Sequence, residues 1–191
     1  MKKICFLVLI LFITDYLYSQ ESHIEFKGIP LNGSLSSFVE KMKREGFKFK
    51  EYSDNSVAIM EGLFTGKNVE IFVISSSKTK TVWKVSSYYE GKESWLSLKR
   101  DYNEMVELFK KKYGEPVKHF EFFSKPYYEG DGYEMQALKK EKCFYASFWE
   151  TDKGTMIVEI TEWGQIRVGY EDRINIKVKQ KEELEDSMND I

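Results

Sequence analysis

The sequence predicts an α+β fold of two tandem α-β-β-β units, with the helices packed on antiparallel sheet. Three observations lead to this prediction: an apolar helical stripe occurs twice, a glycine follows each stripe, and the strand-like runs after each glycine share their turns and alternation. The matched segments are 38–40 with 105–107, Gly46 with Gly114, 65–68 with 151–154, and 83–85 with 166–168. Similarity that recurs in order along a chain indicates duplication of one supersecondary unit.

The first unit covers about residues 24–90, beginning with a short strand at 24–29. Ser34 suits the N-cap of a helix, because its hydroxyl can accept a backbone N–H of the first turn. An apolar stripe with helical spacing follows, and Gly46 ends the helix. The stripe consists of Leu35, Phe38, Val39 and Met42. Runs rich in β-branched and aromatic residues then predict three strands. These strands are 57–64, 69–74 and 81–89.

The second unit covers about residues 95–172 and begins with a longer helix. Its apolar residues step by three and four along one face, and the segment 113–116, Tyr-Gly-Glu-Pro, ends the helix because it combines a C-cap glycine with a proline. The stripe consists of Trp95, Leu98, Tyr102, Met105 and Phe109. Strands are predicted at 143–149, 155–161 and 165–170.

The two units differ mainly between the helix and the first predicted strand. The first unit uses residues 47–56 for this connection, whereas the second uses the insertion 115–142. The insertion combines aromatic residues with carboxylates, and two interpretations stay open. In the first, Phe120 and Phe122 form one more strand that closes the core, with 127–132 as its hairpin.

In the second interpretation, the insertion is a recognition surface. Aromatic rings beside carboxylates and a flexible glycine loop suit a protein anchor or a stacking surface for sugar. We expect the phenylalanines to belong to the core and the tyrosines to the recognition surface. The predicted binding residues are Tyr127, Tyr128, Asp131 and Tyr133.

The N-terminus has the pattern of a secretory signal peptide. Lys2 and Lys3 precede the apolar run 4–13, and the small residue Ser19 offers a cleavage site before Gln20. The run is shorter than the ~20 apolar residues that a spanning helix needs, and no second hydrophobic stretch occurs. We therefore expect signal cleavage near Ser19-Gln20, a periplasmic or secreted location, and no integral membrane segment afterwards.

The mature chain is long enough for one domain with a proper core. We expect a single α+β domain at 20–172, followed by a charged C-terminal tail at 173–191 that is solvated or forms a frayed helix. Aromatic residues make up 16% of the sequence, and their large side chains bury much apolar surface. Cys143 is the only cysteine after signal cleavage, so packing without an internal disulfide must stabilise the fold.

Composition argues against several functional classes. The net charge is −2 and arginines are few, so a concentrated basic face for nucleic acid is not expected. The two histidines, His23 and His119, lack the partners of a zinc site, and no phosphate-binding glycine loop occurs. Cys143 could pair with His119 as a nucleophile and base, but a lone cysteine in an apolar run usually behaves as a small buried hydrophobe. We predict no cofactor, no metal and no catalytic residue.

Several motifs resemble known families. The segment 29–34 with Phe38, the helix end 102–116, and Tyr170-x-Asp172-x-x-Asn175 are similar to the repeats of a group of uncharacterised secreted bacterial proteins. More remotely, the chain resembles the periplasmic modules of outer-membrane assembly lipoproteins and, in its tandem arrangement, β-lactamase inhibitor proteins. These resemblances imply helices on an antiparallel sheet that binds other proteins. The chain lacks a lipobox, has one helix per unit, and lacks the inhibitors' disulfides, so no functional residue is carried over.

The resulting functional hypothesis is an exported, non-enzymatic binding module. We expect a protein partner in the cell envelope, contacted by an exposed sheet face or by the insertion. The alternative is a glycan-binding protein that uses the aromatic insertion 119–134. No sequence feature identifies the partner.

Overall fold

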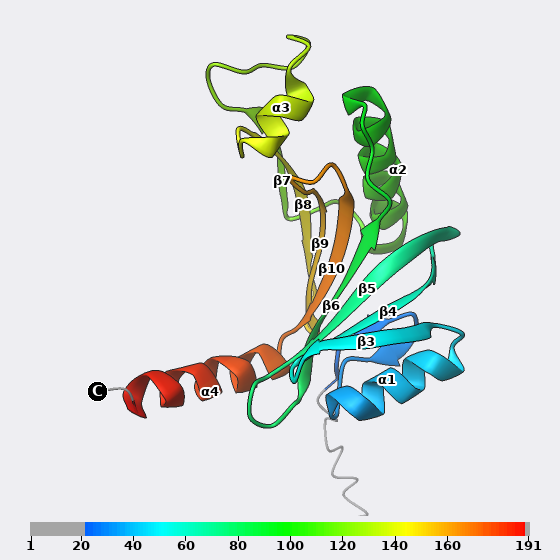
Figure 1. The fold of residues 1–191 in the computed structure, drawn as a ribbon, viewed down its shortest axis with the longest axis vertical. Helices are drawn as coiled ribbons and strands as arrows, with labels where there is room; N and C mark the ends of the chain where they lie inside the picture. Colours follow the sequence, from blue (N-terminus) through cyan, green and yellow to red (C-terminus); the bar gives the residue numbers. More distant parts are fainter. Residues whose placement is uncertain (1–21, 190–191) are drawn as a thin grey trace, which may run out of the picture.

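The computed structural model describes residues 22–189. Within this range the chain forms an eight-stranded antiparallel sheet, a two-stranded hairpin and four helices, which confirms the predicted α+β class (Figure 1). The predicted signal segment 1–19 and its cleavage site lie outside the described residues. The elements in chain order are β1 (Glu25–Phe26), β2 (Ile29–Pro30), α1 (Leu35–Arg44), β3 (Lys48–Asp54), β4 (Val57–Phe64), β5 (Lys67–Ser75), β6 (Val82–Tyr89), α2 (Trp95–Tyr113), β7 (Lys118–Phe123), α3 (Glu134–Lys139), β8 (Cys143–Glu150), β9 (Gly154–Ile160), β10 (Ile166–Asp172) and α4 (Asn175–Asn189).

The large sheet consists of two meanders joined at their last strands. Its strand order is β3-β4-β5-β6-β10-β9-β8-β7, so α1 precedes one meander and α2 precedes the other. β6 and β10 pair antiparallel at the centre, with Ser87 opposite Val168. This order places β3 and β7 at the two edges of the sheet. The duplication remains an interpretation of this shared element order.

Each half contributes four strands to the large sheet, so the predicted count of three strands after each helix is wrong. The missing strand follows the helix directly in each half, as β3 in the first and β7 in the second. β3 is almost entirely exposed and rich in charge, with only Phe49 partly buried. An edge strand of this kind lacks the apolar alternation by which strands are recognised in sequence.

The segment predicted as one strand at 24–29 is a tight hairpin instead. β1 and β2 flank Lys27 and Gly28, whose φ angles are 53° and 79°. Positive φ at both turn positions matches the twist of a two-residue hairpin, and glycine adopts it without steric cost. The hairpin places Phe26 and Leu31 in the core.

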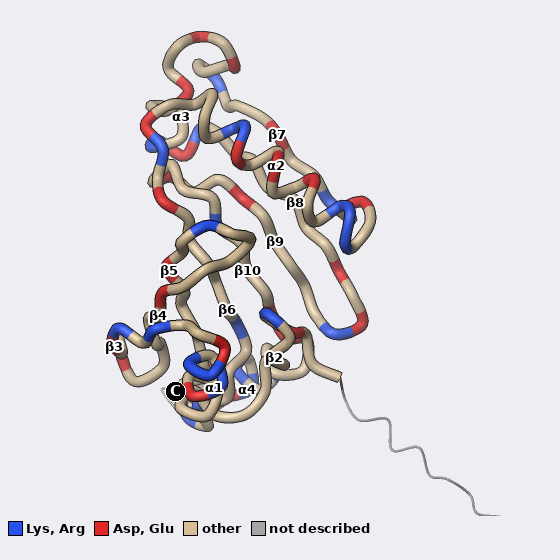
Figure 2. The backbone as a smooth tube through the Cα atoms, turned by 90° about the vertical axis from the view of Figure 1, so that its right-hand side faces the viewer, with Lys and Arg blue, Asp and Glu red and all other residues tan. Residues whose placement is uncertain are grey.

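α1 and α2 lie on the same side of the sheet, as two views at right angles show (Figures 1 and 2). All four residues of the predicted α1 stripe are buried, and the hydroxyl of Ser34 accepts the backbone N–H of Ser37 at 3.4 Å. The second stripe is also confirmed. The buried residues of α2 are Leu98, Tyr102, Met105, Val106 and Phe109.

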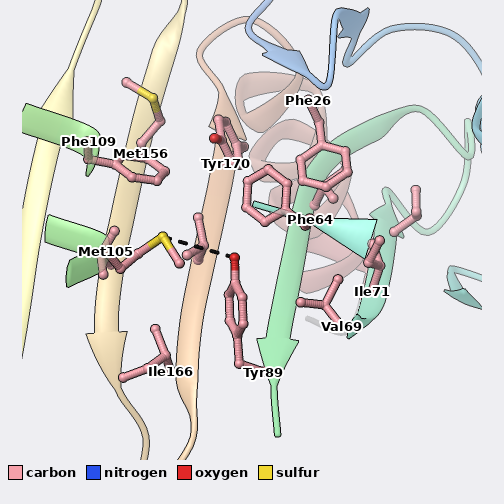
Figure 3. Close-up of a cluster of buried hydrophobic side chains, with 14 of the residues drawn as sticks. Phe26, Phe64, Val69, Ile71, Tyr89, Met105, Phe109, Met156, Ile166 and Tyr170 are labelled. Atoms are coloured by element: carbon pink, nitrogen blue, oxygen red, sulfur yellow. Dashed lines mark hydrogen bonds between the residues drawn. The ribbon is translucent and has the colours of Figure 1, made fainter. Parts of the chain in front are cut away.

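Aromatic side chains connect the halves into one core across the described residues (Figure 3). Phe26 of the hairpin lies 5.0 Å from Phe64 and 5.5 Å from Tyr170, measured between ring centroids. On its other side, Tyr170 lies 6.2 Å from Phe109 of α2. The ring on the central strand β10 therefore joins the hairpin, the first half and the second helix.

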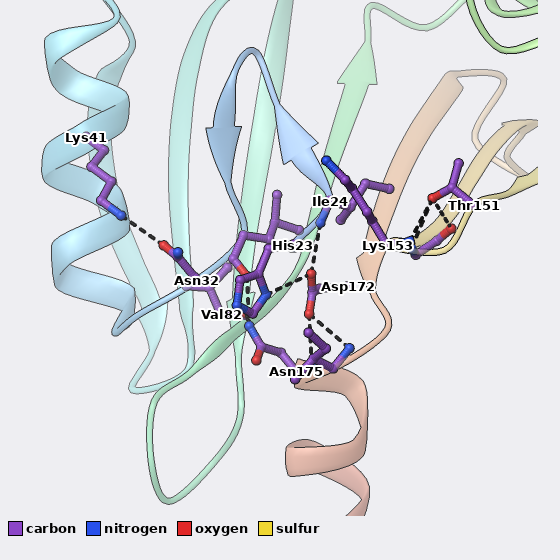
Figure 4. A network of polar contacts seen from close by, with 12 residues as sticks. His23, Ile24, Asn32, Lys41, Val82, Thr151, Lys153, Asp172 and Asn175 are labelled. Carbon is purple, nitrogen blue, oxygen red and sulfur yellow. Dashed lines mark hydrogen bonds and ion pairs between the residues drawn. The ribbon is translucent and has the colours of Figure 1, made fainter. Parts of the chain in front are cut away.

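The C-terminal segment is an anchored helix, which corrects the prediction of a solvated tail or a frayed helix. Asp172 is fully buried and accepts hydrogen bonds from the backbone N–H groups of Ile24 and Asn175, at 3.0 and 2.9 Å, and it contacts His23 Nδ1 at 3.1 Å (Figure 4). The Asn175 amide donates to the carbonyl oxygens of Leu31 and Val82. This network attaches the start of α4 to the hairpin and to β6.

A second anchor lies farther along α4. Glu182 is buried, and its carboxylate accepts hydrogen bonds from the backbone N–H groups of Lys78 and Thr79 at 2.7 and 3.1 Å. Hydroxyl groups in the same loop, of Ser76, Ser77 and Thr79, also donate to it. Burial by itself would raise the pKa of Glu182, but these hydrogen bonds outweigh it and lower the pKa to about 2.

Candidate functional site

The face of the sheet opposite α1 and α2, here called the open face, carries apolar side chains toward both ends of its central row. Neighbours across an antiparallel sheet point to the same side. Among the described residues, no helix runs along this face, and α4 projects from its base (Figure 1). The central row of cross-strand partners is Ile59, Phe72, Ser86, Gly169, Ile157 and Phe148.

Four phenylalanines gather on the β7–β8 end of the open face and form what we call the phenylalanine patch. They are Phe120, Phe122, Phe144 and Phe148. The ring of Phe144 lies between those of Phe120 and Phe122, at centroid distances of 5.7 and 5.6 Å, and Phe120 lies 6.2 Å from Phe148. The exposed fractions of Phe120, Phe122 and Phe144 are 38, 48 and 40%. Contiguous exposed rings of this kind mark interaction surfaces.

The patch corrects the expectation that Phe120 and Phe122 close the core. A strand does form at this position, as the first interpretation of the insertion requires, but these two rings point away from the helices. Only Phe123, at the end of β7, packs against the core. Residues 127–132 do not form a hairpin but belong to a loop that leads into α3.

The alternation of β8 explains how the rings reach the surface. Tyr145, Ser147 and Trp149 point toward α2 and are buried, so the intervening Phe144 and Phe148 must point to the open face. Both sets contain large aromatic side chains. The helix occupies only one side, and the rings on the other side remain without a cover in the described chain.

Paired charges lie next to the central row. Arg167 and Glu159 form an ion pair on neighbouring strands, and Lys84 pairs with Glu171 at 2.7 Å. Basic and acidic residues are interspersed over both halves (Figure 2). The polar side chains beside the central row are therefore largely neutralised by one another.

The predicted binding residues of the insertion divide into two groups. Tyr128 and Tyr133 are exposed, at 65 and 61%, whereas Tyr127 packs against the core. Asp131 accepts the backbone N–H groups of Tyr128 and Tyr133 at 3.1 and 2.7 Å. The carboxylate of Asp131 therefore holds the loop in shape and leaves the rings of Tyr128 and Tyr133 exposed.

Glu129 attaches this loop to the body of the protein. Its carboxylate pairs with Lys99 of α2 and accepts the hydroxyl of Tyr145 at 3.2 Å. The hydrogen bond from Lys99 is the main reason that the pKa of Glu129 lies below its ordinary value. The insertion 115–142 belongs partly to the core, because Ala137 and Leu138 of α3 are buried. Its exposed tyrosines belong to the surface.

One chain of polar contacts, which runs from a buried serine to the surface, has the residue types of a hydrolytic site. The Ser147 hydroxyl lies 2.8 Å from both Tyr102 Oη and His119 Nδ1, and His119 Nε2 lies 3.3 Å from Glu121 Oε1. Serine, histidine and a carboxylate in series can perform acyl transfer. Ser147 is fully buried, however, and its oxygen contacts two side chains inside the protein. This geometry satisfies a buried hydroxyl and leaves no approach for a substrate.

Cys143 does not have the properties of a nucleophile. Burial, with smaller effects from nearby Glu129 and Glu134, raises the pKa of its thiol to about 12. The thiolate is the reactive form of cysteine, so this thiol stays protonated and unreactive at neutral pH. The structure pairs His119 with Ser147 rather than with Cys143.

The described cavities are shallow and chemically mixed. A cavity of about 960 Å³ lies at the end of β3–β6, and its wall carries lysines and glutamates together. Another, of about 400 Å³, lies between the hairpin and the end of α2. Among residues 22–189, no cluster of three metal-ligating side chains occurs, and no helix is long and apolar enough to cross a membrane.

Comparison with known proteins adds no relative: no family model, no curated protein and no solved structure matches this chain.

Proposed function

We propose that this chain is an exported, non-enzymatic binding module that holds a protein partner of the cell envelope against its phenylalanine patch. The observation that carries the proposal is the contiguous row of tilted rings of Phe120, Phe144 and Phe122 on an uncovered sheet face. Aromatic rings supply most of the energy in protein interfaces when a partner removes them from water.

Two further features support a binding role. The polar side chains that could perform chemistry, Ser147 and Cys143, are buried and have internal roles. Export rests on the pattern Lys2-Lys3 before the apolar run 4–13. A rigid sheet that presents exposed rings needs no cofactor to recognise a protein.

The decisive experiment removes the rings from the patch. Changing Phe120, Phe122 and Phe144 together to Ser should weaken capture of the envelope partner at least about tenfold, which corresponds to about 1.4 kcal/mol. The control is Leu63→Ser, because Leu63 is an apolar residue in the other half that is even more exposed, at 60%. Circular dichroism melts verify that both variants are folded. Unchanged capture by the triple variant would refute the proposal.

The glycan alternative depends on the exposed Tyr128 and Tyr133, which Asp131 holds in a fixed loop. Rigid, exposed aromatic rings can stack on sugars. A polysaccharide gel-shift assay tests this function, with Tyr128→Ser/Tyr133→Ser as the informative variant. Retardation that this variant abolishes would favour the glycan, and absence of retardation with polysaccharides of the envelope would remove the alternative.

A further inference from the structure

We propose that two copies of this chain associate through β7, which pairs antiparallel with β7 of the second copy. The two large sheets then join into one continuous sheet. This inference goes beyond the proposed function, because it assigns an occupant to the edge of β7 rather than to its ring-bearing face.

The edge of β7 is regular and accessible. β7 pairs with β8 over six residues in unbroken register, from Lys118 opposite Phe148 to Phe123 opposite Cys143. Within the described chain, no strand lies on its other side. Residues 118–122 are all exposed. A straight, uncovered edge offers a free row of backbone donors and acceptors to another strand.

The opposite edge of the sheet has the usual protection against such pairing. β3 contains two register shifts against β4, between Phe49 and Glu51 and between Tyr52 and Asp54. Bulges and charges of this kind twist an edge away from a second strand. β7 lacks the bulges, so the two edges differ in the feature that prevents sheet extension.

The side chains of β7 identify a second copy as the occupant. Residues directly opposite in an antiparallel pair share a face and interact. When a two-fold axis passes through Phe120, His119 faces Glu121 of the second copy, and Phe120 faces its own counterpart. Lys118 then faces Phe122 of the second copy, where a cation and a ring attract. Each side chain of β7 from Lys118 to Phe122 therefore meets a complementary one.

Other symmetric registers are less favourable. An axis through Glu121 places two carboxylates directly opposite each other, which is destabilising. An axis through Phe122 leaves only three residues of each β7 paired. The repulsion between carboxylates and the number of paired residues together favour the register centred on Phe120.

The contact joins the two phenylalanine patches, because the Phe120 rings lie on the open face of both copies. Five residues per copy form a small interface, so we expect a weak dimer with a dissociation constant on the order of micromolar. Sedimentation equilibrium of the chain from Gln20 should show a monomer–dimer equilibrium. A strict monomer at concentrations up to about 1 mM would overturn the proposal.

Charge reversal tests the register. His119→Glu should weaken dimerisation at least tenfold, because the introduced carboxylate would then face Glu121 of the second copy. The double variant His119→Glu/Glu121→Lys should restore it, because the introduced carboxylate then faces a lysine of the second copy. Glu51→Lys on β3 is the matched control and should change nothing. Circular dichroism checks the fold, because His119 also contacts Ser147.

Two outcomes of these variants contradict the proposal. A dimer that His119→Glu leaves intact would place the contact elsewhere, and so would a dimer that Glu51→Lys disrupts. Failure to dimerise does not affect partner capture by the patch, so the two proposals can be separated. The charge variants leave Phe120, Phe122 and Phe144 in place.

Discussion

β3 and β7 occupy the same place in the two halves of the molecule, because each is the first strand after its helix and the outermost strand of its meander. β3 is bulged and charged, with a single half-buried ring at Phe49. β7 pairs without interruption and presents Phe120 and Phe122 to solvent. Equivalent positions in one architecture therefore carry opposite surface chemistry.

This difference shows that the shared order of elements constrains which side chains are buried in the core, but not which side chains are exposed at the surface. The two helices bury matched stripes, in which Met42 and Phe109 hold corresponding places with exposed fractions of 0 and 3%. The edges face water, where packing does not constrain the side chains. Residues at the edges can therefore differ between the halves without loss of core packing. How far the two halves are equivalent can be measured by substitution.

The largest effects are expected in the matched helix stripes. Met42→Ala and Phe109→Ala should each lower the free energy of unfolding by about 2–5 kcal/mol, through lost burial and an unfilled cavity. Phe109 should cost at least as much, because its ring contacts Trp149 and Tyr170. Denaturant unfolding measures both values. A near-neutral Phe109→Ala would break the equivalence of the two helices.

The hairpin turns of the two halves should respond differently to an added methyl group. A Cβ at Gly154 would overlap the backbone oxygen of Glu171, so Gly154→Ala should cost about 1–3 kcal/mol. Gly66, in the corresponding turn, has a φ of 80° and open space around it. Gly66→Ala should cost about 1 kcal/mol, through backbone strain at the positive φ alone. A larger loss for Gly66→Ala than for Gly154→Ala in thermal unfolding would contradict this distinction.

The loop between β5 and β6, residues 76–81, holds α4, and this attachment should fail in acid. The pKa of Glu182 is about 2 in the folded protein and lies below its ordinary value of 4.5. A depressed pKa contributes stability that is fully present above pH 4.5 and is lost as the pH falls through 2. Far-ultraviolet circular dichroism should therefore show loss of helix across this window.

Glu182→Gln provides the matched control for the acid effect, because an amide keeps the shape but does not titrate. This variant should have less helix at neutral pH and lack the transition that the carboxylate causes. An identical acid transition in both proteins would show that Glu182 does not control α4. The second half offers no such anchor among the described residues, because the connection between β9 and β10, residues 161–165, makes no hydrogen bond to α4.

The smallest effect is expected for the exposed tyrosines of the insertion. Tyr128→Ser/Tyr133→Ser should change stability by no more than about 0.5 kcal/mol, as surface substitutions usually do. Tyr127→Ser should be clearly more destabilising, because Tyr127 packs against the core. Thermal melts of the two variants compare them directly. A large loss in the double variant would place all three tyrosines in the core.

The fold class and the helix faces follow from the sequence because they depend on local spacing. Leu35, Phe38, Val39 and Met42 recur with the period of a helix, and each of them is buried. The β-rich runs likewise predict β4, β5, β6, β8, β9 and β10. The edge strand β3 escapes prediction because charged, exposed residues carry no periodic signal. The anchor at Glu182 could not be predicted either, because a run of charged residues does not indicate which of them will meet hydrogen-bond donors of a loop about 100 residues earlier in the chain.

The sequence by itself determined that the chain contains two amphipathic helices and enough β-strands to form an α+β domain. Only the tertiary structure decided which side of β8 is inside. Cys143, Tyr145 and Trp149 alternate with Phe144 and Phe148, so both faces of the strand are apolar and aromatic. Local pattern cannot distinguish two apolar faces, because burial depends on which of them α2 covers after the chain folds. The uncovered set, with Phe120 and Phe122 of the neighbouring strand, became the phenylalanine patch.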